Sequence, residues 1–131
     1  LTEAGKSLGD YSSITVGAVR ALVDIHDDLS VLYLDAHADL RDEYMGSRWG
    51  HASVARRVHE ICPLVQVGVR SLSEEERDFI REVRTPVIFW TLPRPGIAEL
   101  ADKVLDSLSA APASAPPPAG PAPTVDPSAV E

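Results

Sequence analysis

The stretch VLYLDAHAD, residues 31–39, decides the fold, because a short apolar run passes directly into alternating acidic and histidine residues. Residues 31–34 form the kind of largely apolar run that is typical of a parallel strand covered on both faces. Two further runs of this kind follow at residues 64–69 and 87–90. The sequence therefore predicts three short strands.

Stretches with helical spacing of apolar residues flank these runs. The first covers residues 14–25 and follows two serines that can cap a helix by accepting a hydrogen bond from a free backbone N–H group. A second covers residues 54–62, and a third follows a capping box formed by Ser73 and Glu76. Residues 97–108 have the most regular amphipathic spacing in the chain. The sequence predicts a helix in each of these four stretches.

The alternation of helices and strands predicts an α/β fold with a parallel sheet and right-handed crossovers. In such sheets, ligands bind at the carboxyl ends of the strands. Residues 35–39 follow the first strand and are therefore where we expect the chemistry of the protein. A sheet of three strands is small, so we expect both of its edges to be open unless further strands or a partner cover them.

Composition separates the end of the chain from the rest. Residues 110–131 hold 7 of the 11 prolines and no lysine, arginine or aromatic residue. Such a segment cannot bury a core, so we expect a disordered Ala/Pro-rich tail. Residues 1–109 are predicted to form one folded α/β domain. Because the chain begins at Leu1 and has a single methionine, Met45, we expect an excised piece or an incomplete reading frame.

Charge and hydropathy argue against several classes of protein. The chain has 12 Lys and Arg against 20 Asp and Glu, a net charge of -8, and such a field repels the phosphates of nucleic acids. No apolar run approaches the roughly 18 residues that a membrane span needs, and the first residues show no signal-peptide pattern. Cys62 is the single cysteine, so there is no disulfide framework. We expect a cytoplasmic protein that binds neither nucleic acid nor a membrane.

Asp35, His37 and Asp39 occupy every second position after the first predicted strand. If the backbone stays extended there, their side chains point the same way and can converge on one ion. Two carboxylates and one imidazole suit Mn²⁺ or another divalent ion that accepts oxygen and nitrogen ligands. The alternative is a polar loop in which Asp35 caps a turn and His37 hydrogen-bonds locally.

The longer run LDAHADLRDEYMGSRWGHAS, residues 34–53, resembles the second metal motif of the agmatinase branch of the ureohydrolases, the arginase/agmatinase family. The flanks, ITVGAVRAL at residues 14–22 and EICPLVQVGVRSLSEEE at residues 60–76, resemble the same proteins in order and spacing. The resemblance covers about residues 9–108. It implies a three-layer α/β/α fold with a parallel sheet, of which this chain holds only part.

The resemblance also implies a reaction and a set of site residues. Members of this family hold two Mn²⁺ ions that share a hydroxide, which attacks the carbon of a guanidinium group and releases urea. From agmatine the other product is putrescine, a step of polyamine metabolism. By motif position, Asp35, His37 and Asp39 are metal ligands, with Asp35 bridging both ions, and His51 is a proton shuttle. The alternative for His51 is a histidine at a helix N-terminus with no task. Members of the family also commonly form homo-oligomers.

The chain departs from the family pattern at two of its three metal motifs. Where the first motif has a histidine ligand, an alignment without a gap places Ser12, and a hydroxyl is a much poorer ligand. The third motif, Asp-x-Asp-x-x-Asp-Pro, is not found after Leu108. We therefore expect an incomplete second metal site and impaired activity in this chain alone. The alternatives are a non-catalytic pseudoenzyme or scaffold relative with partial metal binding, or a decaying reading frame without selected activity.

Overall fold

The computed structural model describes residues 4–92 and 95–110, and residues 4–13 by their backbone alone. It contains four α-helices, one 3₁₀ turn and three strands within that part of the chain. Their bounds are α1 Ala4–Val23, β1 Val31–Leu34, η1 His51–Ser53, α2 Val54–His59, β2 Leu64–Val69, α3 Glu74–Val83, β3 Val87–Phe89 and α4 Ile97–Ala110. The predicted tail lies outside the described residues from position 111 onward.

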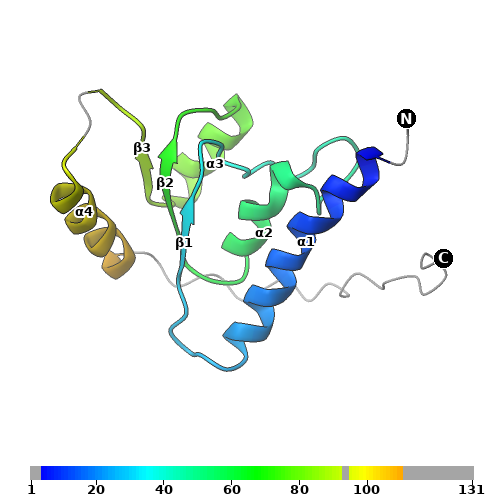
Figure 1. Cartoon of the computed structure of the whole chain (residues 1–131), viewed down its shortest axis with the longest axis horizontal. Coiled ribbons are helices and arrows are strands. Elements are labelled where there is room, and N and C mark those ends of the chain that lie inside the picture. Colours follow the sequence, from blue (N-terminus) through cyan, green and yellow to red (C-terminus); the bar gives the residue numbers. More distant parts are fainter. Residues whose placement is uncertain (1–3, 93–94, 111–131) are drawn as a thin grey trace.

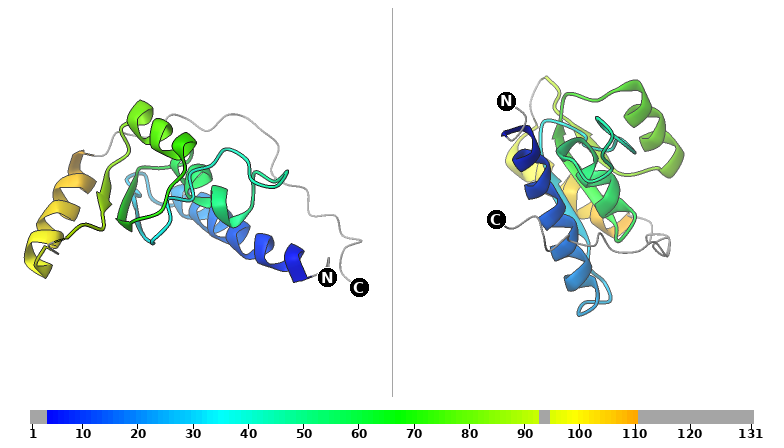
Figure 2. Two further views of the ribbon diagram at one scale, coloured as in Figure 1. Left: turned by 90° about the horizontal axis from the view of Figure 1, so that it is seen from above. Right: turned by 90° about the vertical axis from the view of Figure 1, so that its right-hand side faces the viewer.

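The three strands form one parallel sheet in the order β1-β2-β3. Helices α1 and α2 lie on one side of this sheet and α4 on the other (Figure 1). Seen from above, α4 and α1 stand at opposite ends of the molecule with the strands between them (Figure 2, left). The predicted α/β fold with a parallel sheet is confirmed, and helices occupy both faces.

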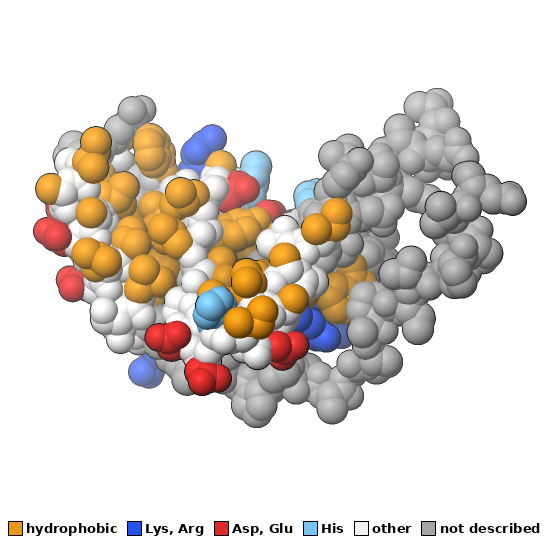
Figure 3. Space-filling view, turned by 60° about the horizontal axis from the view of Figure 1, so that its bottom comes forward, with side chains coloured by type: hydrophobic (Ala, Val, Ile, Leu, Met, Phe, Trp, Pro, Cys, Tyr) orange, Lys and Arg blue, Asp and Glu red, His pale blue; other side chains and the backbone are white. Residues whose placement is uncertain are grey.

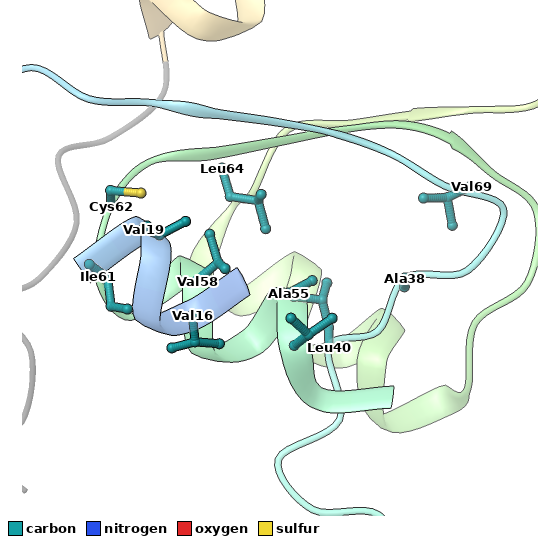
Figure 4. Close-up of a cluster of buried hydrophobic side chains, with 11 residues drawn as sticks. Val16, Val19, Ala38, Leu40, Ala55, Val58, Ile61, Cys62, Leu64 and Val69 are labelled. Atoms are coloured by element: carbon teal, nitrogen blue, oxygen red, sulfur yellow. The ribbon is translucent and has the colours of Figure 1, made fainter. Parts of the chain in front are cut away.

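The core lies between the sheet and the pair of helices α1 and α2 (Figure 4). Leu64 and Val69 of β2 are 1% and 0% exposed, and Ala55 and Val58 of α2 are both 0% exposed. Leu40, which follows the motif loop, is also 0% exposed in this cluster. The residues after β1 are therefore fixed by apolar packing before any polar contact is considered.

Helix α1 differs from its prediction in its start and in the face it buries. It begins at Ala4, so Ser12 and Ser13 lie inside the helix and do not cap it. The predicted apolar stripe is largely exposed, with Ile14 at 64% and Leu22 at 43%, and the buried positions are Val16 and Val19. The segment carries apolar residues on two faces, and contact with α2 selects the face with the valines.

Helix α4 covers its face of the sheet only in part. It follows the predicted spacing, yet Ile97 is 90% exposed and Leu105 is 62% exposed. Leu32 and Leu34 of β1 are exposed as well. Figure 3 shows hydrophobic side chains gathered on the side of the molecule where α4 lies. Among the described residues, no helix is both long enough and apolar enough to span a membrane.

Gly68 shapes the carboxyl end of the sheet. Its φ of 93° coincides with an irregularity in the pairing of β2 with β3, between Val67 and Val69. A Cβ atom at this position would stand 3.4 Å from the backbone oxygen of Asp35. Glycine adopts this backbone conformation without strain, so β2 can bend close to the start of the predicted metal motif.

Candidate active site

A cavity of about 520 Å³ lies at the carboxyl end of β1, where the parallel sheet was expected to place its site. All four residues predicted from the sequence line it, namely Asp35, His37, Asp39 and His51. Side chains from three later segments complete the wall: Arg41, Tyr44, Ala52, Ser71, Leu72, Ser73 and Glu76. The fold therefore brings the motif after β1, the η1 turn and the start of α3 to one place.

Asp35 and His37 interact with each other at the start of the motif. The backbone N–H of His37 donates to Asp35 Oδ1 at 2.9 Å, and His37 Nδ1 lies 3.3 Å from the same oxygen. This is the local polar arrangement that the alternative interpretation of the motif described. Both side chains are accessible from the cavity, at 39% and 66% exposure respectively.

Asp39 leaves the extended conformation that the alternation of the motif assumed. Strand β1 ends at Leu34, and Asp39 has a φ of 50°, in the left-handed region. The extended backbone on which the convergence of the three side chains depended is therefore not present at residue 39. Polar contacts and the packing of the residues around it outweigh the strand preference here.

The Asp39 carboxylate accepts a hydrogen bond from the Tyr33 hydroxyl at 2.7 Å. Burial raises the pKa of Asp39, and the negative charge of Asp35 acts in the same direction, whereas the Tyr33 hydrogen bond and two histidines lower it. Burial and the bond to Asp39 also raise the pKa of Tyr33, so its hydroxyl keeps its proton. The site thus holds a partly buried carboxylate with one oxygen already hydrogen-bonded.

The donor types around the cavity fit a divalent ion that takes oxygen and nitrogen ligands, because they are carboxylates and imidazoles. The arrangement of these side chains does not enclose a divalent ion. Within residues 4–92 and 95–110, no group of three His, Cys, Asp or Glu side chains is placed to hold a metal ion. The predicted ligands share a cavity without forming a preassembled site.

His51 begins the η1 turn and is exposed at the cavity wall. The Tyr44 ring meets the His51 ring edge to face, with centroids 5.7 Å apart, and the Arg41 guanidinium lies 5.1 Å from the Tyr44 centroid. Tyr44 is fixed by two backbone hydrogen bonds to Ser47, of 2.9 and 3.0 Å. The sequence reasoning gave Tyr44 no role in orienting His51.

The tight turn after Tyr44 explains why the backbone of Tyr44 is paired with that of Ser47. Met45 and Gly46 have φ values of 51° and 78°, and a tight two-residue turn of type I′ requires positive φ at both central positions. Glycine after the methionine was the signal in the sequence for such a turn. The ring of Tyr44 is therefore held against His51 by backbone geometry.

A buried arginine that the sequence reasoning did not single out supports the same loop. Arg57 is 2% exposed, and its Nη2 atom lies 2.7 Å from Asp42 Oδ1 and 2.9 Å from Glu60 Oε1. The hydrogen bond from Arg57 lowers the pKa of Asp42. Arg48 approaches the same Asp42 oxygen at 3.0 Å. An arginine among valines in a short helix carries no sequence signal for this contact.

The residues that align with the first family motif lie within helix α1. Ser12, which stands where the motif has a histidine, falls among the residues whose side chains the structure does not describe. Residues 111–131, where the third motif is not found, lie outside the described residues. Among the described residues, the side chains that line the cavity all fall between positions 35 and 76.

The family model described as "Arginase family" matches residues 7–114. The chain is 41% identical over 86 residues to an N(1)-aminopropylagmatine ureohydrolase of Synechocystis, covering 64% of this chain and 28% of that protein. It is 47% identical over 70 residues to an agmatinase of Pyrococcus horikoshii, covering 53% of this chain and 23% of that protein.

A third relative is an uncharacterized 32.2 kDa protein of Methanothermus fervidus. It is 43% identical over 75 residues, which are 56% of this chain and 26% of that protein. In all three comparisons the matched part spans only about a quarter of the length of the relative.

Proposed function

Because the chain belongs to the arginase family, we propose that it carries part of the active site of a manganese-dependent ureohydrolase. The proposed substrate is a guanidino compound such as agmatine, which is hydrolysed to putrescine and urea in cytoplasmic polyamine metabolism. The observation that carries the proposal is the cavity at the end of β1, which Asp35, His37, Asp39 and His51 all line. The names of two relatives, an agmatinase and an N(1)-aminopropylagmatine ureohydrolase, support the substrate class.

Asp35, His37 and Asp39 would hold the metal, and their oxygen and nitrogen atoms suit Mn²⁺. The chemistry that bound manganese supplies is Lewis acidity, which brings a water molecule close to deprotonation at neutral pH. Burial raises the pKa of Asp39, so an ion bound there would have to displace the proton that burial favours. The local contact between Asp35 and His37 would open when both bind an ion.

His51 would move the proton of the reaction. The water oxygen bonds to the guanidinium carbon, the C–N bond to the substrate chain breaks, and the departing amine needs a proton. A ring nitrogen of His51 can hold and deliver that proton, because an imidazole nitrogen can both accept and donate one and His51 is exposed on the cavity wall. The edge-to-face contact with Tyr44 keeps the ring in position.

A second candidate is a non-catalytic relative that keeps the scaffold and only partial metal binding. Two observations favour it. The described residues contain no group of three side chains placed for a metal ion, and Ser12 stands where the first family motif has a histidine. In this case the protein would act by binding a partner, including further copies of itself.

Calorimetric titration of the purified chain with Mn²⁺ tests the proposal. We expect binding that Asp35→Ala and His37→Ala each weaken by about 10- to 100-fold. His26→Ala is the matched control, because His26 is an exposed histidine outside the cavity. An affinity for Mn²⁺ that is unchanged in both Asp35→Ala and His37→Ala would overturn the assignment of these residues as metal ligands. If binding depends on the site but no urea is released from agmatine, the non-catalytic relative is the better description.

A further inference from the structure

The loop of residues 38–42, here called the Asp39 loop, follows β1, which ends at Leu34, and contains the predicted ligand Asp39. Outside a strand its backbone polar groups lose their ladder partners, and buried groups of this kind must find others. Leu40 is 0% exposed, so its N–H group has no access to solvent. The loop is also held through Ala38, Arg41 and Asp42, whose N–H groups donate to Ser71, Ala52 and Glu75, but the buried Leu40 N–H group is the one next to Asp39.

Glu76 of α3 supplies that acceptor from 36 residues away. Its Oε1 atom accepts from the Leu40 N–H group at 2.9 Å. Its Oε2 atom accepts from the Ser73 N–H group at 2.6 Å and from the Ser73 hydroxyl at 2.8 Å. Glu76 itself is 5% exposed. One buried carboxylate thus joins the start of α3 to the Asp39 loop.

These contacts exceed what a helix cap needs. In a capping box the glutamate returns to the backbone of the capping serine, which Oε2 does here. The bond from Oε1 to Leu40 adds nothing to the helix. It serves the loop. Glu75 also accepts from this loop, from the Asp42 N–H group at 3.1 Å, but Glu75 is exposed whereas Glu76 is buried.

The Asp39–Leu40 peptide unit is held on both sides. The Asp39 carbonyl oxygen accepts from the Arg56 N–H group at 3.2 Å, and the Leu40 N–H group donates to Glu76. Fixing this peptide plane restricts ψ of Asp39, the torsion next to its φ of 50°, and a positive φ costs energy for a residue other than glycine. The direction of the Asp39 side chain follows from that backbone.

We propose that Glu76 is a positioning residue that holds Asp39 in its left-handed conformation and aims its carboxylate into the cavity. This inference rests on the proposed function, because it takes Asp39 as a metal ligand. Glu76 acts through the Leu40 N–H group and not as a ligand.

Hydrogen exchange and Mn²⁺ titration of the full 131-residue chain test the proposal together. In Glu76→Ala we expect the Leu40 amide to exchange at least about tenfold faster, because it has lost its acceptor. We expect the affinity for Mn²⁺ to fall by about 10- to 100-fold, as for other groups that orient ligands. Glu74→Ala is the matched control, since Glu74 lies in the same helical turn with its side chain 90% exposed.

A second variant covers the case in which Glu76→Ala does not fold. Glu76→Leu keeps a side chain of similar volume but has no accepting oxygen, so we expect protection to be lost at both Leu40 and Ser73. Ser73→Ala separates the cap from the loop, because it weakens the start of α3 while leaving Oε1 free to accept from Leu40. We expect normal protection of the Leu40 amide in Ser73→Ala.

The outcomes separate this inference from the proposed function. Unchanged exchange at Leu40 in both Glu76 variants would overturn the positioning role. Faster exchange with unchanged Mn²⁺ affinity would also overturn it, because the loop would then move without consequence for the metal. If the unaltered chain binds no Mn²⁺, the proposed function fails and the positioning of a ligand fails with it, whereas the exchange data still decide whether Glu76 holds the loop.

Discussion

His59 is a histidine that the fold half-buries away from the cavity. Its Nδ1 atom lies 3.3 Å from the Thr85 hydroxyl, and its ring meets the Phe79 ring edge to face at 5.5 Å. Burial lowers the pKa of His59, and the positive charge of Arg56 lowers it further. The folded protein therefore holds this ring neutral at a pH at which the unfolded chain already protonates it.

The pH dependence of stability follows from this difference. Below the ordinary histidine pKa of about 6.5 the unfolded chain binds a proton that the folded protein does not, so the free energy of unfolding falls as the pH falls from there through the lower folded value. Above pH 6.5 the ring is neutral in both the folded and the unfolded chain, so this loss of stability is absent. We expect His59→Asn to remove this part of the dependence in urea unfolding series between pH 5 and 7.5.

His26→Asn provides the comparison, because His26 is exposed after the end of α1. It should leave the pH profile of the unaltered chain unchanged. If the pH profile of His59→Asn matches those of His26→Asn and of the unaltered chain, His59 is protonated equally in the folded and the unfolded chain.

At the scale of single residues, the four side chains that the sequence singled out line one cavity, but the sequence did not predict how they are held. The spacing of Asp35, His37 and Asp39 was informative because it follows a strand. The left-handed backbone of Asp39 could not be predicted, since it depends on acceptors and donors that the fold brings from residues 56 and 76. Long-range partners of this kind leave no local pattern in a sequence.

At the scale of elements, the Asp42–Arg57 pair joins the loop after the motif to helix α2. Asp42→Ala removes a hydrogen bond of 2.7 Å from a guanidinium that is 2% exposed. Glu60 still pairs with Arg57, and Asp42 is itself half exposed, so the loss is smaller than for a fully buried pair. We expect the free energy of unfolding to fall by about 1–2 kcal/mol in urea denaturation at pH 7.

The stabilisation by the Asp42–Arg57 pair should also depend on pH. Because the bond from Arg57 lowers the pKa of Asp42 in the folded protein, its contribution is present above the unfolded value near 3.8 and is lost as the pH falls through the folded value. Glu43→Ala is the control, an exposed acidic residue next to Asp42. Equal losses in the two variants would show that net charge, and not the pair, determines the effect.

The sequence predicted helices and strands correctly where residues close together in the chain determine their bounds. Ser73 and Glu76 form the expected capping box at the start of α3, and β2 has its predicted bounds of residues 64–69. The buried face of α1 was predicted wrongly, because its segment offers two apolar stripes and only the position of α2 selects Val16 and Val19. Local periodicity defines a helix more reliably than the neighbour against which it packs.

At the scale of the whole molecule, apolar side chains remain exposed on the α4 side of the sheet. Leu32 is 43% exposed, and Ile97 and Leu105 of α4 are 90% and 62% exposed. Within the described residues β1 pairs only with β2, so its other edge offers free backbone groups as well. An apolar face beside an open strand edge favours association with another chain.

We therefore expect the chain to associate with itself as its concentration rises, with sedimentation velocity as the measurement. Leu32→Lys combined with Ile97→Lys should shift the weight-average mass toward that of a 14.1 kDa monomer. The combination of Ile14→Lys and Met45→Lys is the control, because it replaces two exposed apolar residues on other elements with the same change in charge. If both double variants dissociate equally, reduced net charge or general solubility explains the effect. If the unaltered chain is monomeric throughout, the α4 face does not drive association, and the homo-oligomer expected of this family would need contacts from other surfaces.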